Sequence, residues 1–102
     1  STTRMSAEAR LEHQQRDAQL QTRIETMVEL EYFREWQAKK DAVQEANRRH
    51  DDNAVALGQE LGELIVREFP VDPAEREARR MERFWAKIEA GWTMPAEAEA
   101  SQ

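Results

Sequence analysis

The sequence predicts an all-α protein, and three observations support this expectation. The chain is rich in the good helix formers Ala, Glu, Gln and Arg and holds only three Gly and three Pro. Apolar residues recur at spacings of three and four, which is the period of one helix face. Breaks occur at a polar cluster over residues 50–53 and at a proline-flanked segment over residues 69–73. The second place is a firm helix break, and the first is a candidate break between two helices.

The first segment runs from about Ser6 to about Arg49 without Gly or Pro. Ser6 is a candidate N-cap, and Glu8 in the first turn suits the positive end of the helix dipole. Its apolar face comprises Leu20, Ile24, Met27, Val28, Tyr32, Phe33 and Trp36, and more weakly Val43 and Ala46. We expect one long amphipathic helix here.

The second segment, from Asn53 to about Phe69, can be joined to the first in two ways. Short polar side chains in the cluster His50-Asp51-Asp52-Asn53 compete for backbone hydrogen bonds, which favours a turn and a helical hairpin. A heptad pattern nevertheless crosses this cluster without a slip, and it favours one coiled-coil-like helix over residues 6–69. The pattern comprises Phe33, Trp36, Lys40, Val43, Asn47, His50, Ala54, Leu57, Leu61 and Leu64. We favour the hairpin and keep the long helix as the alternative.

A third helix is expected over about residues 73–90. Pro70 pushes Phe69 out of helical geometry, and Asp72-Pro73-Ala74-Glu75 combines an N-cap, a proline at the first position and a capping-box glutamate. Gly91 ends this helix. We expect residues 1–95 to form a single all-helical domain and residues 96–102 to form a mobile polar tail.

The thin core predicts self-association. Residues 1–19 offer few apolar side chains, and a helical protein with a thin core usually completes it with a second copy. We therefore expect a helical-bundle homodimer. The candidate self-association residues are Phe33, Trp36, Val43, Leu57, Gly58, Leu61, Gly62 and Leu64. Within this set, Gly58 and Gly62 form a small-xxx-small pair, which favours a close helix crossing.

The third helix carries the candidate partner-binding site. Its apolar stripe, which we expect to dock the helix, comprises Ala74, Ala78, Met81, Trp85, Ile88 and Trp92. A basic row falls on or beside the opposite side, formed by Arg76, Arg79, Arg80, Arg83 and Lys87. This row is either a solvated face neutralised by neighbouring glutamates or a contact surface for phosphates or an acidic partner.

The composition excludes several kinds of site. The formal net charge of −6 argues against a general nucleic-acid coat. The chain has no cysteine, so it has no disulfide framework and no Cys-based zinc site. Its two histidines, His13 and His50, lie near aspartates but lack the three or four convergent ligands that zinc requires. An acidic row on the first helix, expected to be solvated rather than catalytic, comprises Glu25, Glu29, Glu31 and Glu35.

From these expectations, we predict a protein that is not an enzyme and that uses neither a cofactor nor a metal. We expect a small protein-binding adaptor or regulator that acts through helix–helix association. One alternative is a nucleic-acid-associated regulator that uses the basic row, and another is an accessory subunit of an enzyme complex. Twelve arginines against three lysines suggest a GC-rich bacterial or phage genome. The lack of a long apolar run predicts no membrane span and a cytoplasmic location.

Overall fold

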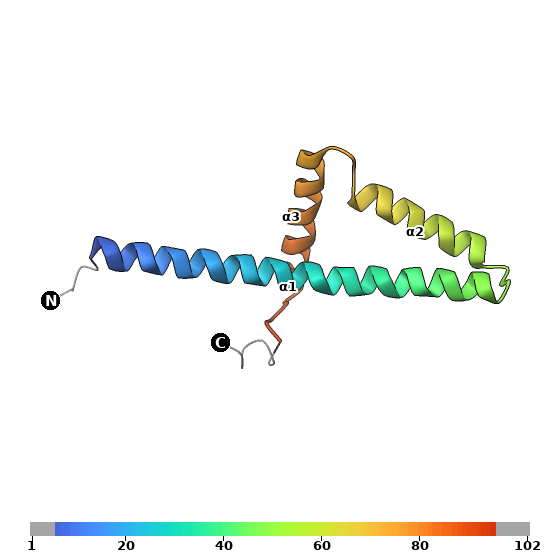
Figure 1. Ribbon diagram of the computed structural model, residues 1–102, viewed down its shortest axis with the longest axis horizontal. Helices are drawn as coiled ribbons and strands as arrows, with labels where there is room; N and C mark the ends of the chain where they lie inside the picture. Colours follow the sequence, from blue (N-terminus) through green and yellow to red (C-terminus); the bar gives the residue numbers. More distant parts are fainter. Residues whose placement is uncertain (1–5, 96–102) are drawn as a thin grey trace.

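A computed structural model describes residues 6–95, which form three helices and no strand (Figure 1). Helix α1 spans Ala7–Arg48, α2 spans Ala54–Glu68 and α3 spans Pro73–Glu89. This confirms the all-α class and the third helix. Helices α1 and α2 form a hairpin, so the alternative of one continuous helix over residues 6–69 is wrong. Residues 96–102, predicted to be a mobile tail, lie outside the described range.

The capping residues predicted for α1 and α3 are confirmed. The Ser6 hydroxyl accepts a hydrogen bond from the amide of Ala9 at 3.1 Å. At the start of α3, Asp72 Oδ2 accepts from the amide of Glu75 at 3.2 Å, and Pro73 occupies the first turn. Each cap satisfies one of the backbone amides that a helix N-terminus leaves without an intrahelical partner. The first and third helices therefore begin where their local sequence dictates.

The turn between α1 and α2 is a Schellman motif with His50 in the left-handed position. The His50 amide donates to the carbonyl of Asn47 at 3.1 Å, and the Asp51 amide donates to that of Ala46 at 2.9 Å. His50 has φ 55°, a conformation that usually selects glycine. Asp51 then accepts through Oδ1 from the amide of Asn53 at 2.9 Å, which turns the chain into α2. The heptad pattern does not indicate this turn, because the left-handed position holds a histidine, and that histidine also fits the heptad spacing.

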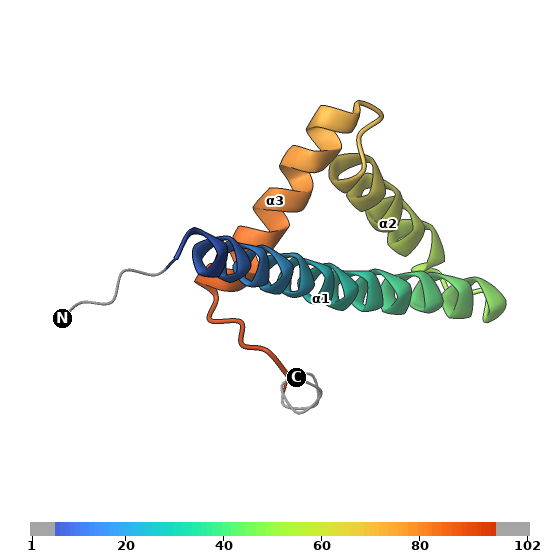
Figure 2. The same cartoon turned by 60° about the vertical axis from the view of Figure 1, so that its left-hand side comes forward.

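The three helices enclose a small core and leave a long extension. The molecule measures 73 × 34 × 19 Å and has a radius of gyration of 19.8 Å, against about 13 Å for a compact domain of this length. Among the described apolar residues, those buried are Val28, Ala46, Ala54 and Phe84. Helix α3 crosses α1 near its middle, and the N-terminal part of α1 extends beyond the other helices (Figures 1 and 2). Within residues 6–95, no helix is both long enough and apolar enough to cross a membrane.

Candidate protein-interaction site

The guanidinium of Arg83 lies at the junction of the three helices. Its Nη2 and Nε donate to the two carboxylate oxygens of Glu29 on α1, at 2.6 and 3.2 Å. Its Nη1 donates to Oε2 of Glu68 at the end of α2, at 3.0 Å, and to the Glu68 carbonyl at 3.2 Å. One side chain of α3 therefore ties α1 and α2 together.

Two aromatic rings also contact this guanidinium. Arg83 Cζ lies 5.1 Å from the ring centroid of Trp36 and 5.3 Å from that of Phe69. The two rings meet edge to face, with centroids 4.9 Å apart. Burial by itself lowers the pKa of Arg83, but its hydrogen bonds to Glu29 and Glu68 outweigh that effect and hold the pKa above its ordinary value. Arg83 therefore stays charged inside a paired, ring-lined site.

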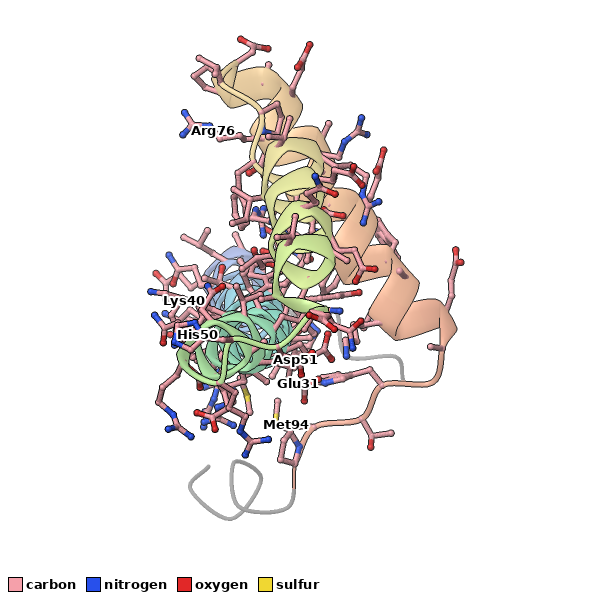
Figure 3. All side chains as sticks on the ribbon, turned by 90° about the vertical axis from the view of Figure 1, so that its right-hand side faces the viewer. Glu31, Lys40, His50, Asp51, Arg76 and Met94 are labelled. Atoms are coloured by element: carbon pink, nitrogen blue, oxygen red, sulfur yellow. The ribbon has the colours of Figure 1, made fainter. Side chains whose placement is uncertain are left out.

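Lys87 makes the next contact between α3 and α1. Its Nζ lies 3.0 Å from Glu35 Oε1, 3.7 Å from Glu31 Oε2 and 4.8 Å from the ring centroid of Tyr32. The hydrogen bond to Glu35 raises the pKa of the Lys87 ammonium. Tyr32 in turn donates its hydroxyl to the carbonyl of Arg83 at 3.2 Å. Beyond α3, the Trp92 indole donates to Glu31 at 2.8 Å. Glu31 is labelled in Figure 3.

Three of the five residues of the basic row face α1 rather than solvent, which corrects the sequence-based placement for Arg80, Arg83 and Lys87. Arg83 is buried, and Arg80, Arg83 and Lys87 reach carboxylates of α1. Arg79 pairs within its own helix with Glu82 at 3.0 Å. Arg76 is exposed near the end of α3 that lies away from α1 (Figure 3). The side of α3 that packs against α1 therefore lies between the predicted apolar stripe and the basic row, rather than on the apolar stripe itself.

The acidic row of α1 is the counterpart of the basic row. We expected solvated carboxylates, but Glu25, Glu29, Glu31 and Glu35 all pair with cations of α3. Glu35 is paired, but its side chain stays 51% exposed. For the other three, with side chains 17–32% exposed, the expectation was wrong because opposite charges on α1 and α3 face one another. Their similar spacing along the two helices was the signal that could have revealed the pairing.

An apolar groove opens between α1 and α2 on the surface of the hairpin. It has a volume of about 530 Å³. Its apolar lining, which we call the hairpin groove, comprises Phe33, Trp36, Leu61, Leu64, Ile65 and Phe69. Polar side chains of Glu29, Gln37 and Lys40 complete its border. Phe33 is 57% exposed although it belongs to the apolar face of α1. The groove therefore presents aromatic and aliphatic surface to solvent inside a polar border.

The predicted self-association residues lie in different surroundings. Trp36, Leu61 and Leu64 are partly buried in the hairpin, and Val43 and Leu57 line a second hollow between the same two helices. Phe33 faces solvent. The two glycines do not form a tight crossing within the chain. A Cβ on Gly58 would meet Val43 at an ordinary 3.9 Å, and a Cβ on Gly62 would meet nothing within 4 Å. Whether these residues join two copies stays a prediction.

The histidines remain apart from any ligand cluster. His13 Nε2 lies 3.5 Å from Asp17 Oδ2 on the exposed surface of α1. Across residues 6–95, no group of three or more His, Asp or Glu side chains is placed to hold a metal ion. Comparisons with protein-family models, with curated proteins and with solved structures found no match for this chain. Its own geometry is therefore the basis for a functional proposal.

Proposed function

We propose that this chain is a small non-enzymatic protein-binding adaptor or regulator that holds an apolar helix of its partner in the hairpin groove. The observation that carries the proposal is Phe33, a large aromatic side chain that is mostly exposed in a groove bordered by polar residues. Grooves of this kind receive the apolar face of an amphipathic helix. Exposed aromatic residues surrounded by a polar border also resemble the centre and rim of protein interfaces.

The Arg83 junction supports this proposal because it holds the groove in shape. Trp36 and Phe69 line the groove and also contact the Arg83 guanidinium. Arg83 is in turn fixed by Glu29 and Glu68 from the two helices that form the groove. A groove that is already ordered before binding loses less conformational entropy when the partner arrives. The ion pairs of Arg83 therefore support binding indirectly, because they hold the rings of Trp36 and Phe69 in place in the groove.

Of the two alternatives, the nucleic-acid-associated regulator has less support. A nucleic-acid contact through the basic row would need cations that are free to meet phosphates, whereas Arg80, Arg83 and Lys87 pair with carboxylates. An accessory subunit of an enzyme complex would use the same groove and differ only in what the partner does. A cytoplasmic location in a bacterial host stays an expectation from composition.

The proposal is tested by comparing two exposed apolar positions on α1. Phe33 is 57% exposed inside the groove, and Leu11 is 55% exposed far from it. Capture from extracts of the source organism should yield a protein at fixed stoichiometry with the parent chain and with Leu11→Asp. Phe33→Asp should lose it, because binding would bury an unpaired carboxylate. Retention by Phe33→Asp would rule out the groove. Capture of nucleic acid that weakens steeply with added salt would favour the basic row instead.

A further inference from the structure

Lys40 borders the hairpin groove, and its charge has no partner within the described chain. The other polar residues of the border are engaged. Arg83 holds the carboxylate of Glu29, and the amide of Gln37 donates to Oδ1 of Asp41 at 3.1 Å. Lys40 is exposed, and within residues 6–95 its ammonium makes no ion pair and donates no hydrogen bond. Among the residues that line the groove, Lys40 is therefore a cation that the chain itself leaves to solvent.

On its face of α1 and across the groove, Lys40 has apolar or uncharged neighbours. Those one helical turn away on α1 are Trp36, Gln37, Val43 and Gln44. Those that α2 contributes to the groove are Leu61, Leu64 and Ile65. The adjacent residue Lys39 differs, because it lines the second hollow between α1 and α2 together with Glu60 and Glu63. Lys40 also lies on the opposite side of α1 from Glu31, which meets α3 (Figure 3).

We propose that the partner helix held in the hairpin groove carries an acidic side chain that pairs with Lys40. This inference deepens the proposed function and rests on it, because it names the chemistry of the helix that the groove receives. A docked helix removes water from the Lys40 ammonium, and a charge that loses its water without gaining a partner opposes binding. A carboxylate of the partner restores the lost interaction as a charge-assisted hydrogen bond.

The place of Lys40 on α1 predicts where the partner carries its carboxylate. Lys40 follows Phe33 by seven positions, so the two residues share a face and lie about 10 Å apart along the helix. A helix that lies along the groove covers both with residues of similar spacing. Its acidic residue should therefore lie about seven positions from the apolar residue that covers Phe33. A lysine among apolar seam positions fixes the register of coiled coils in the same way.

Charge favours a single carboxylate over a polyanion as the group that meets Lys40. The chain has a net charge of −6, which repels a nucleic acid as a whole. Phosphate binding also draws on several cations at once, whereas the cation in the groove lining is Lys40 alone. One acidic residue on an otherwise apolar helix face matches both the lining of the groove and its one unpaired charge.

Selection from a displayed peptide library tests the inference without knowledge of the natural partner. The library holds amphipathic helices of about 18 residues, with apolar residues fixed on one face and varied residues elsewhere. Peptides are kept when they bind the parent chain and fail to bind Phe33→Asp. Asp or Glu should be enriched seven positions from the apolar residue whose replacement by Ala abolishes binding. Enrichment of Lys or Arg there, or no preference, would overturn the inference.

A charge exchange then locates the carboxylate at Lys40. Fluorescence anisotropy compares a selected peptide with a version that carries Lys in place of its acidic residue. Lys40→Glu should weaken binding of the acidic peptide about tenfold or more and strengthen binding of the Lys version, because attraction and repulsion change places. The matched control Lys39→Glu makes the same change in net charge and should alter either affinity less than about threefold. Equal effects of the two variants would overturn the inference.

Two results separate this inference from the proposed function. Peptides that require Phe33 but bind the parent and Lys40→Glu equally well overturn the pairing and leave the groove intact. A selection that yields no peptide dependent on Phe33 contradicts the groove itself. Both lysines are exposed, so circular dichroism and urea unfolding should show that Lys39→Glu and Lys40→Glu keep the fold of the parent.

Discussion

Arg83 on α3 donates hydrogen bonds to both carboxylate oxygens of Glu29 on α1, with Nη2–Oε1 and Nε–Oε2 distances of 2.6 and 3.2 Å. This paired contact is stronger and more directional than a single hydrogen bond between charged groups. Glu68 completes the pairing from α2 at 3.0 Å. Loss of Arg83 would therefore remove the ion-pair partner of Glu29 and leave Glu68 with its longer contact to Arg67, at 3.4 Å.

Arg83→Ala should lower the free energy of unfolding by about 3–5 kcal/mol, as expected when one member of a buried ion pair is removed. Urea unfolding followed by circular dichroism measures this effect. The matched control is Arg76→Ala on the same helix, which should change stability by less than about 0.5 kcal/mol because Arg76 is exposed. Arg83→Lys keeps the charge but loses the paired geometry, so its stability should fall between the parent and Arg83→Ala. Equal stability of the Arg83 and Arg76 variants would contradict the junction.

Neighbouring aromatic residues of α3 should differ sharply in their contribution to stability. Phe84 is 7% exposed and Trp85 is 52% exposed. Phe84→Ala should cost about 3–5 kcal/mol, as for a buried aromatic residue, and Trp85→Ala about half of that or less. Thermal unfolding of the two variants provides the comparison. A larger loss for Trp85→Ala would show that the apolar stripe, rather than the side between the stripe and the basic row, docks α3.

Much of the fold could be predicted from local sequence. The caps at Ser6 and Asp72 and the glycine end at Gly91 depend on residues within one turn of each helix, so they are visible without tertiary structure. The sequence favours the hairpin without excluding the long helix, because His50 occupies the left-handed position of the turn. A glycine at that position would have indicated the turn directly.

The candidate site was harder to predict because it depends on how helices face one another. Hydrophobic periodicity pointed to Trp85 and Ile88 as the docked side of α3. Ile88 is partly buried, but Trp85 is 52% exposed. The observed contact also uses Arg83 and Lys87, whose charges are compensated by carboxylates more than forty positions earlier in the chain. A pattern along one helix shows which residues share a face, but it does not show whether another helix neutralises that face.

The left-handed His50 leads to a prediction for the turn. His50→Gly should raise the free energy of unfolding by about 0.5–1 kcal/mol, since glycine adopts positive φ without steric cost. Chemical denaturation measures the change. As a control, Asn47→Gly places glycine inside the last turn of α1 and should lower stability by a few tenths of a kcal/mol or more. A loss of stability in His50→Gly would mean that the imidazole makes a compensating contact.

Alkaline pH should weaken the contact between α1 and α3. The hydrogen bond to Glu35 raises the pKa of Lys87, and burial raises that of Tyr32. Each group then holds its proton more tightly in the folded chain than in the unfolded one, so stability falls as pH rises above about 10. Unfolding measured between neutral pH and pH 11 should show this loss, and it should be smaller in Lys87→Met and Tyr32→Phe. An equally steep loss in both variants would assign it to other groups.

In-cell photo-crosslinking tests the central claim, that the hairpin groove binds a protein, most directly. A photoreactive phenylalanine analogue at Phe33 reports on the groove, and the same analogue at Arg76 reports on the exposed end of the basic row. The proposal predicts a defined protein adduct from position 33 and none of that mass from position 76. No protein adduct from position 33, with nucleic-acid adducts from position 76, would contradict it.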